Sequence, residues 1–178
     1  MHVKRTWRVF WDLQCPYSKR MWKNFTAIKE RFSDDFDFEI SLTSLLFHPQ
    51  AFTAQCGASL IEREKGRDVM FKYVDACFEN QESYLNDAIG DAKKSEIAAV
   101  FASIAENAGI FDDKFTKEIF LRDLNDWEKA AKPAYTEHKK VLAYGAYSTP
   151  SNAIDEKLVL NTESAWGPDE WAEKLKSL

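Results

Sequence analysis

Polar and apolar positions follow strand-like and helix-like patterns in turn along the first part of the chain. Residues Thr6–Trp11 form a short run rich in β-branched and aromatic residues, which is typical of a buried strand. From Pro16 to Phe32, apolar residues recur at spacings of three and four, which predicts an amphipathic helix. Between Phe36 and Leu42, apolar and polar residues alternate, which predicts a second strand with one buried face. This order predicts a βαβ unit with parallel strands and a right-handed connection.

The pattern then becomes helical and stays so from Ala51 to Gly145. Pro133 lies near the end of this block, where a proline kinks a helix or splits it in two. The predicted helical segments are Ala51–Lys65, Asp68–Asn80, Lys94–Ala108, Asp112–Leu121 and Asn125–Tyr144.

The last part of the chain returns to strand-like patterns. Pro150–Asp155 and Leu158–Asn161 predict a β-hairpin, and Gly167–Pro168–Asp169 precedes a predicted amphipathic helix. The chain is therefore predicted to be an α/β protein whose strands are divided between its two ends. We expect residues 1–50 and 145–178 to form one domain and residues 51–144 to form an inserted helical subdomain.

Composition narrows the classes of function. Of the 178 residues, 45% are hydrophobic and 14% are aromatic, enough for a core without disulfide bonds. A net charge of −5 argues against a nucleic-acid partner, which requires a basic surface. No apolar run is long enough to span a membrane.

The number and spacing of the cysteines and histidines indicate a cellular compartment and whether a metal site is expected. The three cysteines are irregularly spaced and do not predict a disulfide framework. The first residues are charged and lack a following apolar stretch, so no signal peptide is visible. These features favour a cytoplasmic protein, or a secreted one if a signal has been trimmed away. The three histidines and three cysteines show no metal-ligand spacing, and no metal is expected.

Cys15-Pro16-Tyr17-Ser18 is the stretch that most clearly carries chemistry. Cys15 lies between a predicted strand and a predicted helix, where the helix dipole favours a thiolate nucleophile. Pro16 suits the first turn of that helix. Ser18 lies one turn after Cys15 and is predicted to donate a hydrogen bond to its sulfur. Since Ser18 has no thiol, it cannot complete a disulfide with Cys15.

Three stretches of the chain and the order in which they occur resemble the thioredoxin-fold superfamily, and its DsbA-like thiol–disulfide oxidoreductases in particular. The first stretch is the Cys15 motif. The further stretches are Phe47-His48-Pro49-Gln50-Ala51 and Gly145-Ala146-Tyr147-Ser148-Thr149-Pro150. The resemblance implies a thioredoxin fold with a large all-helical insertion between its βαβ and ββα halves. It also implies a cis peptide bond before Pro150, beside the nucleophile, and an extended substrate held by the Thr149 backbone, with Pro16 and Tyr17 contributing to substrate binding.

The chain departs from the family pattern at the position of a buried acidic residue. The resemblance implies a buried carboxyl six positions before the nucleophile, where this chain has Val9. Asp12 is nearer to Cys15, and we expect it to face solvent. His48 is expected to be a surface residue, with proton transfer near Cys15 as the alternative, since histidine titrates near neutrality.

Three functions remain open at this point. The first is a DsbA-like thiol–disulfide oxidoreductase or isomerase that acts through Cys15 alone, with Ser18 either natural or an engineered replacement of a cysteine. The second is a glutathione-dependent transferase or isomerase similar to the kappa class, whose members use a serine at the position of Cys15. The third is a redox-inactive module that binds a peptide in an aromatic groove formed by Trp11, Tyr17 and Trp22.

The expected partners follow from these functions. They are a protein or peptide disulfide or thiol, or glutathione as a co-substrate, with no bound cofactor, no nucleic acid and no membrane. An aromatic-rich surface would permit a dimer. Cys56 and Cys77 are expected in the helical core, and the alternative for either is to resolve a disulfide on Cys15.

Overall fold

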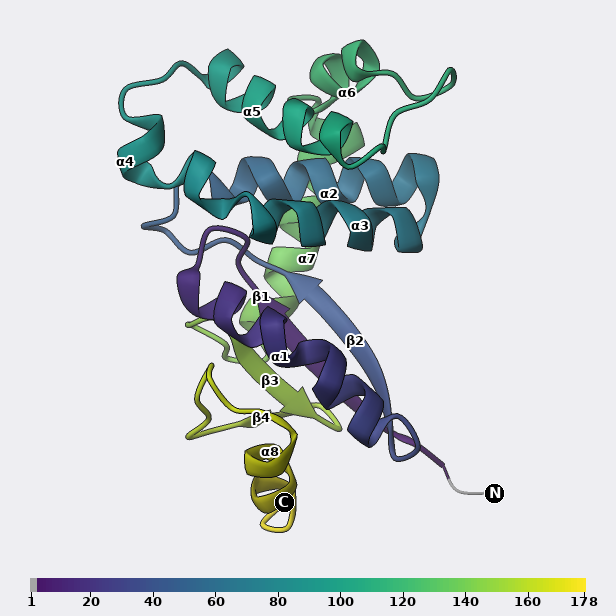
Figure 1. Cartoon of the computed structure of the whole chain (residues 1–178), viewed down its shortest axis with the longest axis vertical. Helices are drawn as coiled ribbons and strands as arrows, with labels where there is room; N and C mark the ends of the chain where they lie inside the picture. Colours follow the sequence, from purple (N-terminus) through teal and green to yellow (C-terminus); the bar gives the residue numbers. More distant parts are fainter. Residues whose placement is uncertain (1–2) are drawn as a thin grey trace.

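A computed structural model describes residues 3–178 and places a four-stranded sheet at the centre of one end of the molecule (Figure 1). The strand order is β2-β1-β3-β4. The β1–β2 pair is parallel, whereas β3 pairs antiparallel with both β1 and β4, which confirms the predicted βαβ unit and the hairpin. The strands are β1 (Arg5–Trp11), β2 (Phe36–Leu42), β3 (Ser151–Ile154) and β4 (Lys157–Val159).

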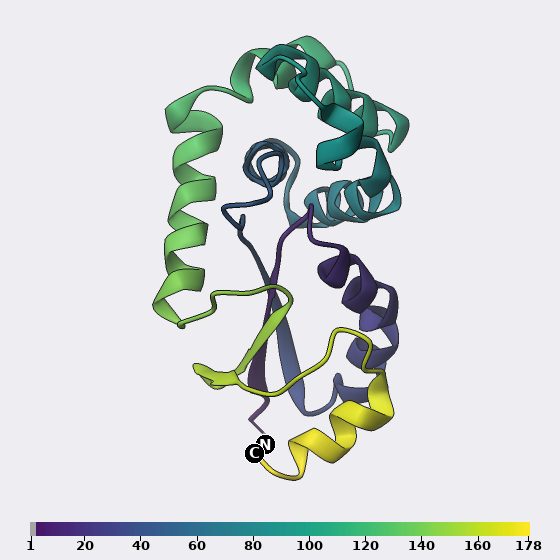
Figure 2. The ribbon, with the colours of Figure 1, turned by 90° about the vertical axis from the view of Figure 1, so that its left-hand side faces the viewer.

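Helices cover both faces of the sheet, and the remaining helices form a separate layer at one end of it. Figure 2 shows α1 and α7 on opposite sides of the strands, and Figure 1 shows α2 to α6 stacked beyond the end of the sheet. The helices are α1 (Pro16–Phe32), α2 (Ala51–Lys65), α3 (Arg67–Glu79), the 3-10 helix η1 (Gln81–Tyr84), α4 (Asn86–Ile89), α5 (Lys94–Asn107), α6 (Lys117–Asp123), the π-helix η2 (Trp127–Ala131), α7 (Lys132–Ala143) and α8 (Pro168–Leu175).

The central strand β1 has side chains buried on both faces because α1 and α7 cover the two faces of the sheet. Successive side chains of a strand point to opposite faces. Accordingly, Trp7, Val9 and Trp11 belong to the main core with α1, while Phe10 packs against Val141 of α7. The Trp7 ring lies 4.7 Å from the Trp171 ring of α8, measured between centroids, and such aromatic pairs add about 0.5–1.5 kcal/mol to simple burial.

The hairpin between β3 and β4 turns through Asp155 and Glu156. Their φ angles of 46° and 67° lie in the left-handed region that two-residue hairpin turns require. The Asp155 carboxylate accepts hydrogen bonds from the Arg5 side chain and the Thr6 amide, so the turn is tied to β1.

The helical block differs from the sequence prediction in two respects, and its last helix contains the predicted irregularity. The predicted helix at 112–121 begins only at Lys117, because the Asp112 carboxylate caps a turn by accepting the amides of Lys114 and Phe115. The short elements η1 and α4 were not predicted. The helix predicted over 125–144 changes from the π-helix η2 to the α-helix α7 next to Pro133, but the backbone stays helical at the junction, so the chain is not divided into two separate helices there.

α7 joins the two parts of the molecule. It was predicted within the inserted block, yet its end packs on the sheet through Val141, beside Phe10 and Ala153. The residues before it, in η2, lie with the inserted helices, so the chain re-enters the sheet domain along α7 (Figure 2).

Candidate active site

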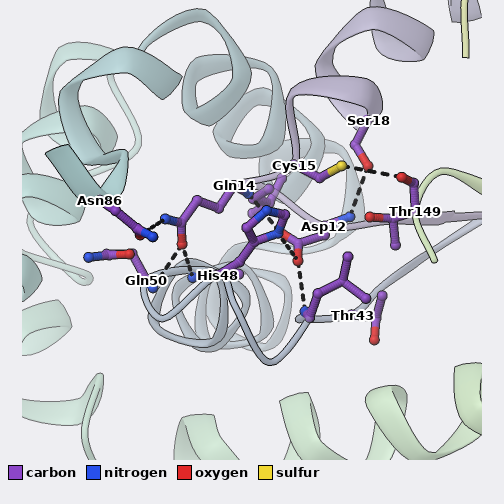
Figure 3. Close-up of polar contacts among 12 residues, drawn as sticks. Asp12, Gln14, Cys15, Ser18, Thr43, His48, Gln50, Asn86 and Thr149 are labelled. Atoms are coloured by element: carbon purple, nitrogen blue, oxygen red, sulfur yellow. Dashed lines mark hydrogen bonds and ion pairs between the residues drawn. The ribbon is translucent and has the colours of Figure 1, made fainter. Parts of the chain in front are cut away.

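Cys15 lies where β1 ends and α1 begins, and it is buried, with only 3% of its surface exposed. Its thiol donates a hydrogen bond to the main-chain oxygen of Thr149, with 3.2 Å between sulfur and oxygen (Figure 3). The Thr149–Pro150 peptide bond is cis, as expected. Two segments separated by 134 residues in the sequence therefore meet at the sulfur atom.

Ser18 is fully buried and faces the same turn, but its hydroxyl oxygen bonds to the backbone. It accepts the amide of Asp12, with 3.2 Å between the two atoms. Cys15 is the N-cap residue of α1, yet its side chain makes no capping hydrogen bond. The sulfur instead points toward the Thr149 carbonyl oxygen, on the segment that carries the cis-proline.

The expectation that Asp12 faces solvent is wrong. Its side chain is fully buried, three positions before Cys15, in a turn closed by the Cys15 amide and the Asp12 carbonyl, with 3.1 Å between nitrogen and oxygen. One carboxylate oxygen accepts the Gln14 amide at 2.7 Å and the other accepts the Leu45 amide at 2.8 Å. A buried carboxylate is tolerated when it is hydrogen-bonded in this way. The site therefore has a buried acid, although the position of Val9 does not supply it.

The expectation that His48 is a surface residue is also wrong. Only 14% of its side chain is exposed, and its Nδ1 atom lies 2.9 Å from the Asp12 carboxylate. Figure 3 shows Asp12 and His48 paired beside Cys15. The stretch that contains His48 and the Cys15 motif are thus brought together, with Asp12 between them.

The inserted helices hold the active-site turn through uncharged side chains. The Gln81 side chain donates to the carbonyl oxygens of Leu13 and Cys15, at 2.8 and 3.1 Å. The Tyr84 hydroxyl lies 2.8 Å from the Leu13 carbonyl oxygen. Sequence reasoning missed Gln81 and Tyr84, because nothing in a single sequence links them to a turn almost seventy residues earlier.

Gln14 provides a second link to the inserted helices. Its side-chain oxygen accepts the amides of Gln50 and Ala51, at 2.8 and 3.1 Å, and so caps the start of α2. Its side-chain nitrogen donates to Asn86 at 2.7 Å. The turn that carries Cys15 is therefore part of the contact between the two halves of the molecule.

Exposed apolar side chains lie on the three segments that meet at the Cys15 site. Tyr17 at the start of α1 is 55% exposed, and Tyr147 in the segment before Pro150 is 82% exposed. On the loop that carries His48, Leu46 is 102% exposed and Phe47 is 67% exposed. Pro16 is exposed and Pro150 is partly buried. These exposed side chains are called the apolar rim below.

The predicted aromatic groove is not formed as expected. Trp11 is buried at 1% exposure and Trp22 donates its indole N–H to Asp75. Both residues line a cavity of about 500 Å³ between α1 and α3, whose lining does not include Tyr17. Tyr17 therefore belongs to the rim around Cys15 and not to one groove with the two tryptophans.

Cys56 and Cys77 are buried in the helical core and, like Cys15, are free thiols. Burial raises the pKa of Cys56 to about 12 and raises that of Cys77 further. A thiol with so high a pKa is a poor nucleophile near neutral pH. These properties argue against either residue as a resolving thiol.

Neither a metal cluster nor a membrane span is found in the described part of the chain. Among residues 3–178, no three or more histidine, cysteine, aspartate or glutamate side chains are grouped so as to hold a metal ion. No helix within the same residues has the length and apolar character needed to cross a membrane.

Comparisons by sequence found no matching family and no matching curated protein. Comparison with solved structures found similar chains that this one covers almost completely. A candidate protein-disulfide isomerase from Pseudomonas syringae is 17% identical, with a TM-score of 0.75, and the alignment covers 98% of this chain and 94% of that one. MdbA, a thiol-disulfide oxidoreductase from Corynebacterium diphtheriae, is 18% identical, with a TM-score of 0.69 and coverages of 98% and 84%.

The oxidoreductase DsbA from Xylella fastidiosa is also similar, at 13% identity, with a TM-score of 0.65 and coverages of 98% and 88%. At such identities, the similarity shows the fold. The chain has the thioredoxin fold with the helical insertion of DsbA-like proteins, as the sequence predicted.

Proposed function

We propose that this protein is a thiol–disulfide oxidoreductase or isomerase that acts through one nucleophilic sulfur, that of Cys15. The observation that carries the proposal is the 3.2 Å contact between the Cys15 sulfur and the Thr149 carbonyl oxygen, next to a cis-proline. The fold shared with a thiol-disulfide oxidoreductase supports it. Burial raises the pKa of the Cys56 and Cys77 thiols well above the ordinary range, which supports a mechanism in which Cys15 acts alone.

The reaction proceeds in two exchange steps. The Cys15 thiolate attacks one sulfur of a substrate disulfide, a new bond joins Cys15 to that sulfur, and the other sulfur leaves as a thiolate and takes up a proton. A low-molecular-mass thiol, such as glutathione, then attacks the mixed disulfide and releases Cys15. One substrate disulfide and one external thiol become one substrate thiol and one new disulfide, so electrons and protons balance.

The substrate that best fits the site is an extended peptide with apolar or aromatic side chains. Tyr17, Leu46, Phe47 and Tyr147 would contact those side chains, and the Thr149 backbone would lie along the peptide. A reducing compartment such as the cytoplasm would supply the external thiol.

The test is the release of a thiol peptide from its mixed disulfide with glutathione, with reduced glutathione in excess. We expect turnover by the native protein and none above the uncatalysed rate for Cys15→Ala. The proposal is overturned if the native protein and Cys15→Ala release the peptide equally fast.

Two further outcomes identify the rival functions. Conjugation of glutathione to an electrophile that survives Cys15→Ala would favour a kappa-class type of activity. Saturable binding of the peptide, with no release of its glutathione, would favour a redox-inactive binding protein.

A further inference from the structure

The geometry points to His48 and Asp12 as the acid–base pair of the Cys15 site: His48 transfers the proton, and Asp12 positions the imidazole. This inference rests on the proposed function and deepens it, because it identifies how a site with one thiol moves protons in each exchange step.

The hydrogen bonds define the tautomer of His48. An ionised carboxylate only accepts hydrogen bonds, so the Nδ1 atom that lies 2.9 Å from Asp12 carries a proton. In the neutral imidazole, the lone pair is then on Nε2, which is the atom left to accept a proton. Phe47 packs against the imidazole, with 4.6 Å between the ring centroids.

Asp12 is held too firmly to transfer the proton itself. Its side chain has no exposed surface, and its two oxygens accept the amides of Gln14 and Leu45 as well as the His48 nitrogen. The His48 side chain is mostly buried as well, but its 14% exposure leaves it, unlike Asp12, in contact with solvent. In this arrangement His48 is the general base, and the buried Asp12 carboxylate holds the imidazole in one orientation.

Asp12 and Cys15 close the same turn, which places the pair next to the nucleophile. The Cys15 amide donates to the Asp12 carbonyl at 3.1 Å, and the Asp12 amide donates to Ser18. The Cys15 thiol currently donates its proton to the Thr149 carbonyl, a group that cannot remove it. In the first step, His48 accepts this proton and passes it to the leaving thiolate. In the second step, it accepts the proton of the external thiol and returns one to Cys15.

Other charged or titratable groups around the pair do not take over this role. Burial raises the pKa of Tyr84 far above its ordinary range, and the nearby Asp12 charge adds to the effect, so Tyr84 stays neutral. Lys19 and Glu82 face each other at 3.5 Å. His138 lies 2.7 Å from the Thr43 hydroxyl oxygen, without a carboxylate partner among the contacts of the described residues.

The test compares His48→Gln, Asp12→Asn and the matched control His138→Gln. Each protein is assayed from about pH 5 to about pH 8, where histidine changes charge. Two rates are measured: disulfide exchange with the glutathione-linked peptide, and alkylation of Cys15 by iodoacetamide. The second rate requires loss of the Cys15 proton but no disulfide chemistry.

We expect His48→Gln to slow exchange by about 100-fold, the lower end of what general acid–base catalysis contributes. The alkylation profile of the native protein is expected to have an inflection in this range, and that of His48→Gln is expected to lack it. Asp12→Asn should move that inflection to lower pH, because the imidazolium loses its anionic partner. His138→Gln should leave both profiles unchanged.

Unaltered exchange rates and alkylation profiles in folded His48→Gln would overturn the inference. If Asp12→Asn fails to fold, the His48→Gln comparison still decides. If the native protein shows no exchange but its alkylation profile depends on His48, the proposed function fails while the acid–base pair stands.

Discussion

The thiol of Cys15 and the main chain of Thr149 are joined by a hydrogen bond of 3.2 Å, so the nucleophile meets the residue before the cis-proline through its backbone. The Thr149 side chain takes no part in this bond. Its hydroxyl oxygen is buried and has no hydrogen-bond partner within residues 3–178. The hydroxyl group can therefore be replaced without loss of the contact between the Thr149 backbone and Cys15.

Thr149→Val should stabilise the protein by about 1 kcal/mol, because valine has nearly the same shape and removes a buried polar atom that lacks a partner within the described residues. The measurement is chemical denaturation of both proteins at neutral pH. A clear loss of stability would mean that the hydroxyl has a partner, such as a bound water, that valine cannot replace.

Ser18→Cys should turn the site into a dithiol. Ser18 is fully buried one helical turn after Cys15, so we expect the native and the introduced sulfur to form a disulfide on mild oxidation. Alkylation followed by peptide mass analysis should find both thiols protected in the oxidised variant and both labelled after reduction. Ser18→Ala is the control and should keep Cys15 available. If Cys15 and the introduced thiol both stay free after oxidation, the geometry is contradicted.

Gln81→Leu should lower the free energy of unfolding by about 1–3 kcal/mol, because the buried carbonyl oxygens of Leu13 and Cys15 lose a donor. The neighbouring Glu82 provides a matched control. Its side chain is 76% exposed and faces Lys19 at 3.5 Å, so Glu82→Gln should change stability by less than about 1 kcal/mol. Equal effects in the two variants would show that Gln81 does not hold the turn.

Alkaline pH should destabilise the protein in part through Cys56. Burial raises the pKa of this thiol from 9.0 to about 12 in the folded state. The unfolded chain therefore releases the proton at lower pH than the folded chain. The protonated Cys56 thiol therefore makes its full contribution to the free energy of unfolding below about pH 9, and this contribution is lost as the pH rises toward about 12.

Cys56→Ala should therefore show a shallower decline over that range than the native protein, whatever its stability at neutral pH. The measurement is the free energy of unfolding at several alkaline pH values. Because burial also raises the pKa of Cys77 and Tyr84, the variant should still lose some stability. An identical slope for both proteins would contradict the burial of the Cys56 thiol.

The sequence predicted the elements that are long and strongly patterned. The alternation in Phe36–Leu42, the periodicity of Pro16–Phe32 and the helix Ala51–Lys65 agree with the structure. Short elements such as η1 and α4 were missed, because four residues are too few to show a period.

The active site was predicted where chemistry is local and missed where it depends on tertiary contacts. Cys15 carries its signal in the adjacent residues, and the cis bond before Pro150, which the family resemblance implied, is present. The burial of Asp12 was missed because charged residues at loop positions usually face solvent. One local signal was available: an aspartate that starts a turn often accepts the amide two residues later, as Asp12 does from Gln14.

The central claim is that Cys15 is the one thiol that reacts and that no second thiol of the chain resolves it. The most direct test is to incubate the reduced, folded protein with an excess of an aromatic disulfide and to determine its mass and labelled residues. The account predicts one adduct per chain, on Cys15, that persists until an external thiol is added. An unlabelled Cys15, or an adduct that is lost as Cys15 forms a disulfide with Cys56 or Cys77, would contradict it.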